Sequence, residues 1–131
     1  MQWKQKKYDL EDRLIRFACI CLSICELLPA TKSGQNPEYQ LCKSGTAAAL
    51  IYGEAQVAES SADFIHKIKL VLKDVRETSI NLRIINEKPV IKNELIPVAQ
   101  KECNELMAIF IKSIETARSN QHKIKIINTM L

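Results

Sequence analysis

The sequence predicts an all-α protein whose four helices pack as an antiparallel up-down-up-down bundle. With 131 residues, 47% of them hydrophobic, the chain is long enough for one hydrophobic core and too short for two. It holds three glycines and four prolines, so it lacks the many turn positions of an all-β fold or a doubly wound nucleotide fold. Four long stretches carry apolar residues at steps of three and four, and the polar segments between them are short.

The first predicted helix begins after Asp9, because aspartate commonly caps helix N-termini, and it ends before Pro29. Steps of three and four keep its apolar residues on one face: Leu10, Leu14, Phe17, Cys21, Cys25 and Leu28. Residues 31–36 are polar and include Gly34, a composition typical of a loop. We therefore expect a loop between the first two helices.

The second predicted helix begins at Pro37, with Asn36 as its N-cap and Glu38 in its first turn. Proline suits this position because the first helical residues need no amide donor, and glutamate suits the positive end of the helix dipole. The apolar face of this helix carries Leu41, Ala48, Tyr52 and Ala55. The small residues around Gly45 predict a close approach by a neighbouring helix.

The third predicted helix begins at Ser60 or Ser61, where Asp63 completes a capping signal. The connection before it is so short that the second and third helices are predicted to be antiparallel neighbours. The third helix should end near Asn86, before Pro89. Its apolar residues follow a heptad step, typical of a seam that stays buried over several turns: Phe64, Ile68, Val71, Val75, Thr78, Leu82 and Ile85.

The fourth predicted helix runs from around Asn93 or Pro97 to about Arg118, and its inner face carries Val98, Cys103, Leu106, Phe110, Ile114 and Ala117. Beyond it, Lys123–Ile126 alternates polar and apolar residues like a strand, but the alternation is too short to be stable alone. We expect a single bundle domain over residues 1–118. Residues 119–131 are expected to form a C-terminal tail that is loose, or ordered only by a neighbouring subunit.

The five cysteines are odd in number and lie in apolar runs: Cys19, Cys21, Cys25, Cys42 and Cys103. The chain starts with charged residues rather than with the apolar segment of a secretion signal, so we expect reduced thiols and a cytoplasmic location. No window reaches the roughly 18 uninterrupted apolar residues of a membrane-spanning helix. We therefore expect no insertion into a membrane.

Few residues point to catalysis or to a cofactor. Cys21 and Cys25 have the spacing of two metal ligands on one helical face, but no Cys-x-x-Cys pair and no suitably spaced histidine completes a set. Packing as small hydrophobic side chains is the better interpretation. His66 and His122 have no local catalytic partner, and no glycine-rich phosphate loop is present. The prediction is a protein that is not an enzyme and has no metal or cofactor.

Positive charge is the most informative surface signal. The chain has a net charge of +4, which permits a polyanionic partner without requiring one. Four cations of the third helix share one stripe away from its apolar seam: Lys69, Lys73, Arg76 and Arg83. This stripe would follow phosphate groups, helped by three N-terminal lysines: Lys4, Lys6 and Lys7. The alternative is a solvated face balanced by Asp74 and Glu77, which periodicity alone favours.

Two acidic residues lie at the flank of an apolar helix face and are expected to be partly buried. These are Glu54 and Glu77, and their candidate cationic partners are Arg13, Lys43 and Lys67. A carboxylate in such a position needs a cation or a hydrogen-bond donor. Structural ion pairs that set the helix register are a better interpretation than acid–base catalysis.

A series of short motifs gives the chain a family resemblance. In order they are Lys43-Ser44-Gly45-Thr46, Glu54-Ala55, Asp63-Phe64, Lys67-Ile68, Leu72-Lys73-Asp74 and Glu77-Thr78. With these motifs the chain resembles the four-helix-bundle proteins encoded in intervening sequences of 23S ribosomal RNA genes. The likeness covers about residues 8–118, and its best motifs lie between residues 43 and 85.

The resemblance implies an antiparallel four-helix protomer, a homopentameric ring and nucleic-acid binding through basic surface. A related branch of proteins acts as accessory proteins of diversity-generating retroelements, alongside reverse transcriptase and RNA. We therefore expect a non-enzymatic, ribosomal-protein-like oligomer that contacts RNA or DNA phosphates through the cations of the third helix and the N-terminal lysines. The alternative is a protein-interaction scaffold, such as an accessory protein of a reverse transcriptase.

Overall fold

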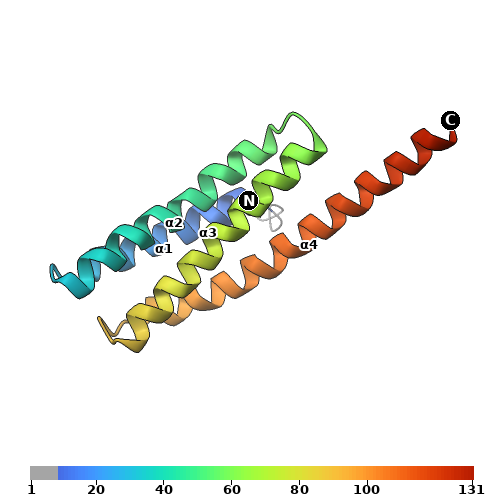
Figure 1. Cartoon of the computed structure of the whole chain (residues 1–131). Helices are drawn as coiled ribbons and strands as arrows, with labels where there is room; N and C mark the ends of the chain where they lie inside the picture. The colour runs from blue at the N-terminus through green and yellow to red at the C-terminus, as the bar shows by residue number, and fades with distance from the viewer. Residues whose placement is uncertain (1–8) are drawn as a thin grey trace, which may run out of the picture.

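The computed structural model describes residues 9–131, so Lys4, Lys6 and Lys7 lie outside the described residues. It contains four helices: α1 (Leu10–Leu27), α2 (Lys32–Gln56), α3 (Ser61–Glu87) and α4 (Leu95–Met130). Within residues 9–131 there is no strand, and the predicted all-α four-helix fold is confirmed (Figure 1). Each helix packs on the next in chain order, and α4 also contacts α1, which closes the bundle.

The hydrophobic core runs along the bundle axis and takes one face from each helix. Its largest fully buried side chains are Leu14, Phe17, Ile24, Leu41, Ile68, Val71, Val75, Leu82, Ile85, Ile96, Leu106 and Phe110. One predicted core position is wrong: Val98 is half exposed, while Ile96 and Ala99 are buried. Phe64 is partly buried and packs against the core, and its neighbour Ile65 is buried. The face that carries Cys103 and Leu106 passes through positions 96 and 99 at steps of three and four.

Two helix starts agree with the sequence. The Asp12 amide donates to the Asp9 carboxylate at 3.3 Å, which confirms Asp9 as the N-cap of α1. The Asp63 amide donates to the Ser60 hydroxyl at 3.0 Å, which confirms the capping signal of α3. In each case a side-chain oxygen satisfies an amide that has no acceptor inside the helix.

The predicted start of α2 is wrong. The helix begins at Lys32, with Thr31 as its N-cap, and Pro37 lies buried inside it. Gly34, predicted to be in a loop, is a helical residue whose amide donates to the Thr31 hydroxyl at 3.2 Å. A Cβ atom at Gly34 would overlap the carbonyl of Pro29. The missing side chain therefore lets the first turn of α2 lie directly against the end of α1.

The expected loose tail differs from the structure, because residues 119–130 continue α4 as one helix. No glycine or proline follows position 97, so no residue there interrupts the helix. The last buried residue of α4 is Ile114. Beyond it the helix leaves the bundle and projects past the other three, with the C-terminus at its far end (Figure 1). We call residues 119–130 the α4 extension.

Two contacts set the distance and register of α2 against its neighbours. The Ser44 and Thr78 hydroxyls lie 2.7 Å apart in the buried interface between α2 and α3, and Thr78 also donates to the carbonyl of Asp74 at 2.9 Å. Because Thr78 uses its single proton there, Ser44 is the donor between the two hydroxyls. On the other side of α2, Gly45 packs against the side chain of Cys21. The small residue thus permits the predicted close approach of a neighbouring helix, which is α1.

None of the helices in residues 9–131 combines the length and the apolar character needed to span a membrane.

Candidate nucleic-acid interface

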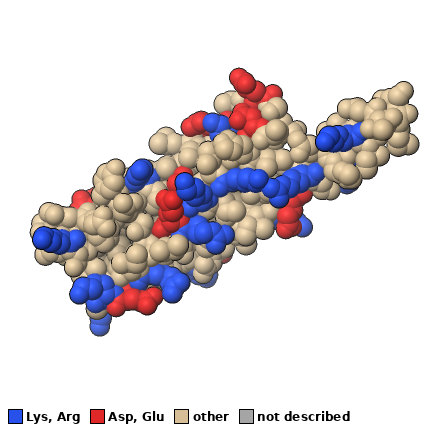
Figure 2. All heavy atoms as spheres, in the orientation of Figure 1, with Lys and Arg blue, Asp and Glu red and all other residues tan. Residues whose placement is uncertain are grey.

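The candidate interface is a row of basic side chains on the outer surface of α3. All four predicted cations are exposed: Lys69, Lys73, Arg76 and Arg83. At about 100° per residue they fall within an arc of roughly 80°, and at 1.5 Å per residue the row is about 21 Å long. In Figure 2 basic side chains form a line along the middle of the molecule, interrupted by a few acidic ones. Helical spacing therefore places these four cations on one solvent-facing strip.

The four cations of the row differ in whether an acidic side chain pairs with them. Arg83 lies 3.5 Å from Glu87, one turn further along α3, in an exposed ion pair. Within residues 9–131, Lys69, Lys73 and Arg76 take part in none of the ion pairs. Exposed ion pairs contribute little free energy, so Arg83 exchanges Glu87 for another anion at small cost. Three unneutralised cations thus form the main part of the row.

The acidic residues expected to balance this row do not pair with it. Within the described part of the chain, neither Asp74 nor Glu77 forms an ion pair. Asp74 is partly buried, and burial, together with the negative charge of Glu77, raises the pKa of its carboxyl. Lys73 and Lys43 act on that pKa in the opposite direction. Lys69, Lys73 and Arg76 therefore have no ion-pair partner in this part of the chain.

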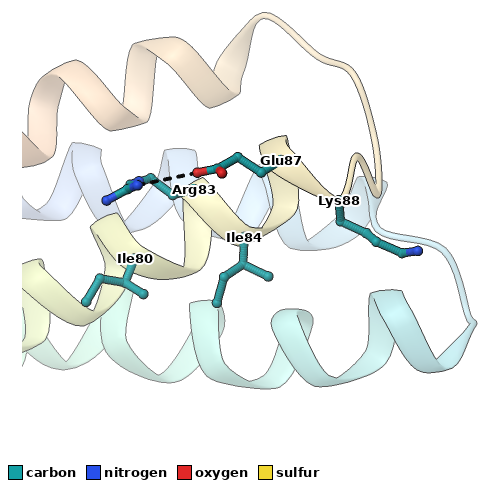
Figure 3. Close-up of a pocket in the computed structure, with 5 residues that line it drawn as sticks. All are labelled: Ile80, Arg83, Ile84, Glu87 and Lys88. Atoms are coloured by element: carbon teal, nitrogen blue, oxygen red, sulfur yellow. Dashed lines mark hydrogen bonds and ion pairs between the residues drawn. The ribbon is translucent and has the colours of Figure 1, made fainter.

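The sequence interpretation missed two apolar residues beside the row. Ile80 and Ile84 are each about half exposed and project together from α3, away from the Arg83–Glu87 ion pair (Figure 3). With those two charged residues and Lys88 they line an open groove of about 550 Å³. The sequence could have indicated that Ile80 and Ile84 are exposed, because both isoleucines fall outside the heptad positions of α3.

One predicted structural ion pair joins α2 to α3. Lys67 Nζ lies 2.8 Å from Glu54 Oε1, and this bond raises the pKa of the lysine. Glu54 is more accessible than expected, since its side chain is 56% exposed. The other two residues predicted for such pairs, Lys43 and Glu77, are exposed and form no ion pair within residues 9–131.

Arg13 has different partners from those expected, because it lies on the side of α1 that faces α4. Its Nε lies 2.7 Å from Glu102 Oε2, its Nη2 donates to Glu102 Oε1 at 2.8 Å, and the same Nη2 lies 2.9 Å from Glu105 Oε1. Hydrogen bonds and charge attraction from both carboxylates raise the pKa of the guanidinium. The two-point contact with Glu102 fixes the orientation of both side chains. Arg13 therefore ties α1 to α4.

The cysteines behave as packing residues. All five are free thiols, and Cys19 is the exposed one. Burial is the main reason that the thiol pKa rises to about 12 in Cys25 and Cys103, and it raises the pKa of Cys21 as well. Within residues 9–131 no three His, Cys, Asp or Glu side chains are placed to hold a metal ion.

Comparison with known proteins gives a structural relative. No family model and no curated protein matches the chain. A solved structure does: a protein of unknown function from the S23 ribosomal protein family of Bacteroides thetaiotaomicron, with 26% sequence identity and a TM-score of 0.73. The match covers 79% of this chain and 96% of that chain. In sequence and in fold, the chain is therefore similar to a member of the S23 ribosomal protein family.

Proposed function

We propose that the chain is a non-enzymatic nucleic-acid-binding protein that contacts the phosphates of RNA or DNA through α3. The observation that carries this proposal is the set of exposed cations without ion-pair partners in the described part of the chain: Lys69, Lys73 and Arg76. Cations that neutralise phosphates release condensed counterions, and this release drives binding at low salt. Lysine and arginine contacts to phosphates carry no sequence information, so binding is expected to be independent of sequence.

The spacing of these cations suits a flexible single strand. Side chains three or four residues apart on a helix lie about 5–6 Å apart, so the three cations form a continuous row. Arg83 lengthens the row by two helical turns when it exchanges Glu87 for a phosphate. The exposed Ile80 lies between the two ends of the row and offers an apolar surface to an unstacked base.

The family likeness is in accord with RNA as the partner. The similar protein carries a ribosomal family name, and the motif series resembles proteins encoded within ribosomal RNA genes. The homopentameric ring that the resemblance implies would present the row of cations five times. Five copies of a chain with a net charge of +4 would together carry about +20, a much stronger attractor for a polyanion than one copy.

The test measures binding of a fluorescent single-stranded RNA of about 20 nucleotides, longer than the site of a small domain, by anisotropy over a series of salt concentrations. The test variant combines Lys69→Ala, Lys73→Ala and Arg76→Ala. Each phosphate contact contributes about 0.7 to the slope of log affinity against log salt on a single strand, so the slope should become shallower by about 2.

The matched control removes three positive charges elsewhere, by Arg16→Ala, Lys32→Ala and Lys101→Ala. These residues are exposed, lie on α1, α2 and α4, and form no ion pair within residues 9–131. The control is expected to keep most of the wild-type slope. Equal losses in both variants would mean that net charge, rather than α3, governs binding. Absence of binding by the wild type at low salt would overturn the proposal.

A second candidate function is a protein-interaction scaffold, for which a reverse-transcriptase-like protein is one expected partner. The observation that favours it is the number of large apolar side chains that remain exposed on several faces, among them Ile15, Leu22, Tyr39, Leu50, Ile84 and Ile127. A stable assembly whose formation is indifferent to RNA would favour this scaffold over the nucleic-acid-binding function.

A further inference from the structure

The α4 extension has an apolar side that faces away from its own bundle. Ile126, Ile127 and Met130 lie on this side, Ile124 lies at its edge next to the bundle, and Leu131 follows directly after the extension; all five are exposed. At about 100° per residue, the centre of their arc is rotated by roughly 120° from the face that α4 buries through Cys103, Leu106, Phe110 and Ile114. The extension therefore does not continue the buried seam of α4.

The side of the extension that faces its own bundle is mainly polar. Gln121, Lys125 and Asn128, with Ile124 at the edge of the apolar arc, line a shallow hollow against the first residues of α3. Exposed aliphatic side chains gain free energy when another surface covers them, so the apolar side of the extension calls for such a partner.

The chain carries a surface of matching chemistry on the outside of α1 and α2, which we call the α1–α2 face. On α1 it consists of Ile15, Cys19 and Leu22, spaced by four and three residues, with Ile15 48% and Leu22 40% exposed. On α2 it consists of small uncharged residues at the same spacing: Cys42, Thr46, Ala49 and Gly53. Small residues beside larger aliphatic ones leave room for the side chains of another helix.

The α4 extension and the α1–α2 face carry opposite charges. The α4 extension carries Lys123 and Lys125, and no Asp or Glu follows Glu115 in the chain. Blue and tan atoms cover the visible side of the projecting end, without red ones (Figure 2). On α1, the apolar residues of the α1–α2 face lie between Glu11 and Glu26, both of which are exposed. Two basic extensions repel each other, whereas a basic extension and an acid-rimmed face attract each other.

The lengths of the α4 extension and of the α1–α2 face are also similar. The extension is about 18 Å long, and the α1 strip from Glu11 to Glu26 is about 22 Å long. Because the extension continues α4 without a break and points out of the bundle, it does not reach the α1–α2 face of its own chain (Figure 1). We infer that the α4 extension docks its apolar side on the α1–α2 face of a second copy of this chain. Each copy offers both surfaces, so the contact repeats from copy to copy.

The test uses the full chain and three variants, in each of which serine replaces one isoleucine, and the three isoleucines have similar exposed fractions. Ile127→Ser changes the extension, Ile15→Ser changes the α1–α2 face, and Ile111→Ser, 43% exposed on the bundled part of α4, is the control. Sedimentation equilibrium should show self-association of the wild type and of the control. Each of the other two variants should weaken it by about tenfold or more, since each removes a buried aliphatic side chain from the contact. Far-UV circular dichroism verifies that all variants keep the helical fold.

A second measurement locates the contact, because the exposed thiol of Cys19 lies on the α1–α2 face. An Ile127→Cys variant treated with a short bismaleimide should give chains linked from position 127 to Cys19, identified by mass spectrometry. The link should disappear when Cys19→Ser is added. Links only between two extensions, or a wild type that stays monomeric at high concentration, would overturn the inference.

A membrane is the competing partner of a basic amphipathic helix. Anionic lipid vesicles provide the remaining arm of the test, and binding to vesicles without self-association would also overturn the inference. The inference does not rest on the proposed nucleic-acid binding. The isoleucine substitutions leave the row of cations on α3 unchanged, so RNA binding and self-association can fail separately.

Discussion

Two glycines of α2, Gly45 in its middle and Gly53 in its last turn, provide a matched pair of substitutions that tests the helix packing. A Cβ atom at Gly45 would lie 2.7 Å from the Cβ and 2.8 Å from the Sγ of Cys21, distances that real Cβ atoms essentially never show. A Cβ atom at Gly53 would meet no heavy atom within 4 Å. Gly45→Ala and Gly53→Ala are the same chemical change in the same helix, so they differ mainly in what the new methyl group contacts.

The expected magnitudes follow from two opposing effects. Alanine is favoured over glycine in a helix interior by about 1 kcal/mol, so Gly53→Ala should raise the free energy of unfolding by about 0.5–1 kcal/mol. At Gly45 the same gain opposes the cost of overpacking a tight interface, about 1–3 kcal/mol, since Cys21 is fully buried. Gly45→Ala should therefore range from no change to a loss of about 2 kcal/mol.

The assay is urea unfolding followed by far-UV circular dichroism, with all variants at a protein concentration low enough for each to be monomeric, because Gly53 lies on the α1–α2 face. Adding Cys21→Ala to Gly45→Ala removes the sulfur from the overlap, so the pair should show a favourable coupling free energy in a double-mutant cycle. If Gly45→Ala stabilised the protein as much as Gly53→Ala, then α1 and α2 would not approach as closely as described.

Three further predictions concern the interior and the contact between α1 and α4. Thr78→Val should lower the free energy of unfolding by about 1–3 kcal/mol, because it leaves the Ser44 hydroxyl buried without a partner. Adding Ser44→Ala should recover part of this loss, and additive losses would contradict the hydrogen bond between the two residues. Cys19 should react with a thiol reagent at neutral pH, whereas Cys103 should react only on unfolding. Because folding raises the pKa of the Cys103 thiol from 9.0 to about 12, the contribution of this thiol to the free energy of unfolding should decline as pH increases from about 9 to 12. A Cys103→Ala variant should show a smaller decline. Arg13→Ala should destabilise by about 1 kcal/mol, less at high salt, and an effect independent of salt in thermal melts would argue against a charge-based contact.

The family-like motifs were good predictors of the fold, and the structure gives the physical reason. Ser44 bonds to Thr78, Gly45 packs against α1, and Lys67 pairs with Glu54 across α2 and α3. These contacts set the distance and register between α2 and its two neighbours, so in this chain the motifs carry information about helix packing. The same contacts say little about outer surfaces, which is why the motifs predict architecture better than function.

The two errors in helix boundaries have different causes. Asn36 and Pro37 form a strong local signal for a helix start, yet the helix begins earlier because Gly34 can lie against Pro29. Lys123–Ile126 has the alternation of a strand, but it continues a helix that had already formed and contains no residue that would end it. Local pattern thus identified most elements, packing against Pro29 decided the start of α2, and the absence of a helix-ending residue decided the end of α4.

The candidate interface was predictable only in part. Helical spacing alone places Lys69, Lys73 and Arg76 on one exposed strip. The partners of Arg13 depend on which side of α1 meets α4, and no local pattern contains that information. Whether Asp74 neutralises the strip depends in the same way on its partial burial in the bundle.

The hydroxyl pair between α2 and α3 has a consequence for conformational uniqueness. Aliphatic side chains tolerate sliding and rotation of one helix against another, whereas the buried Ser44 hydroxyl reaches its acceptor, Thr78 Oγ1, only when α2 and α3 keep this alignment. The Ser44→Ala/Thr78→Val double variant should therefore remain folded but populate several alignments of α2 and α3. Broadened methyl resonances in its NMR spectrum, beside sharp ones in the wild type, would show that these two hydroxyls select a single native arrangement from many of similar compactness.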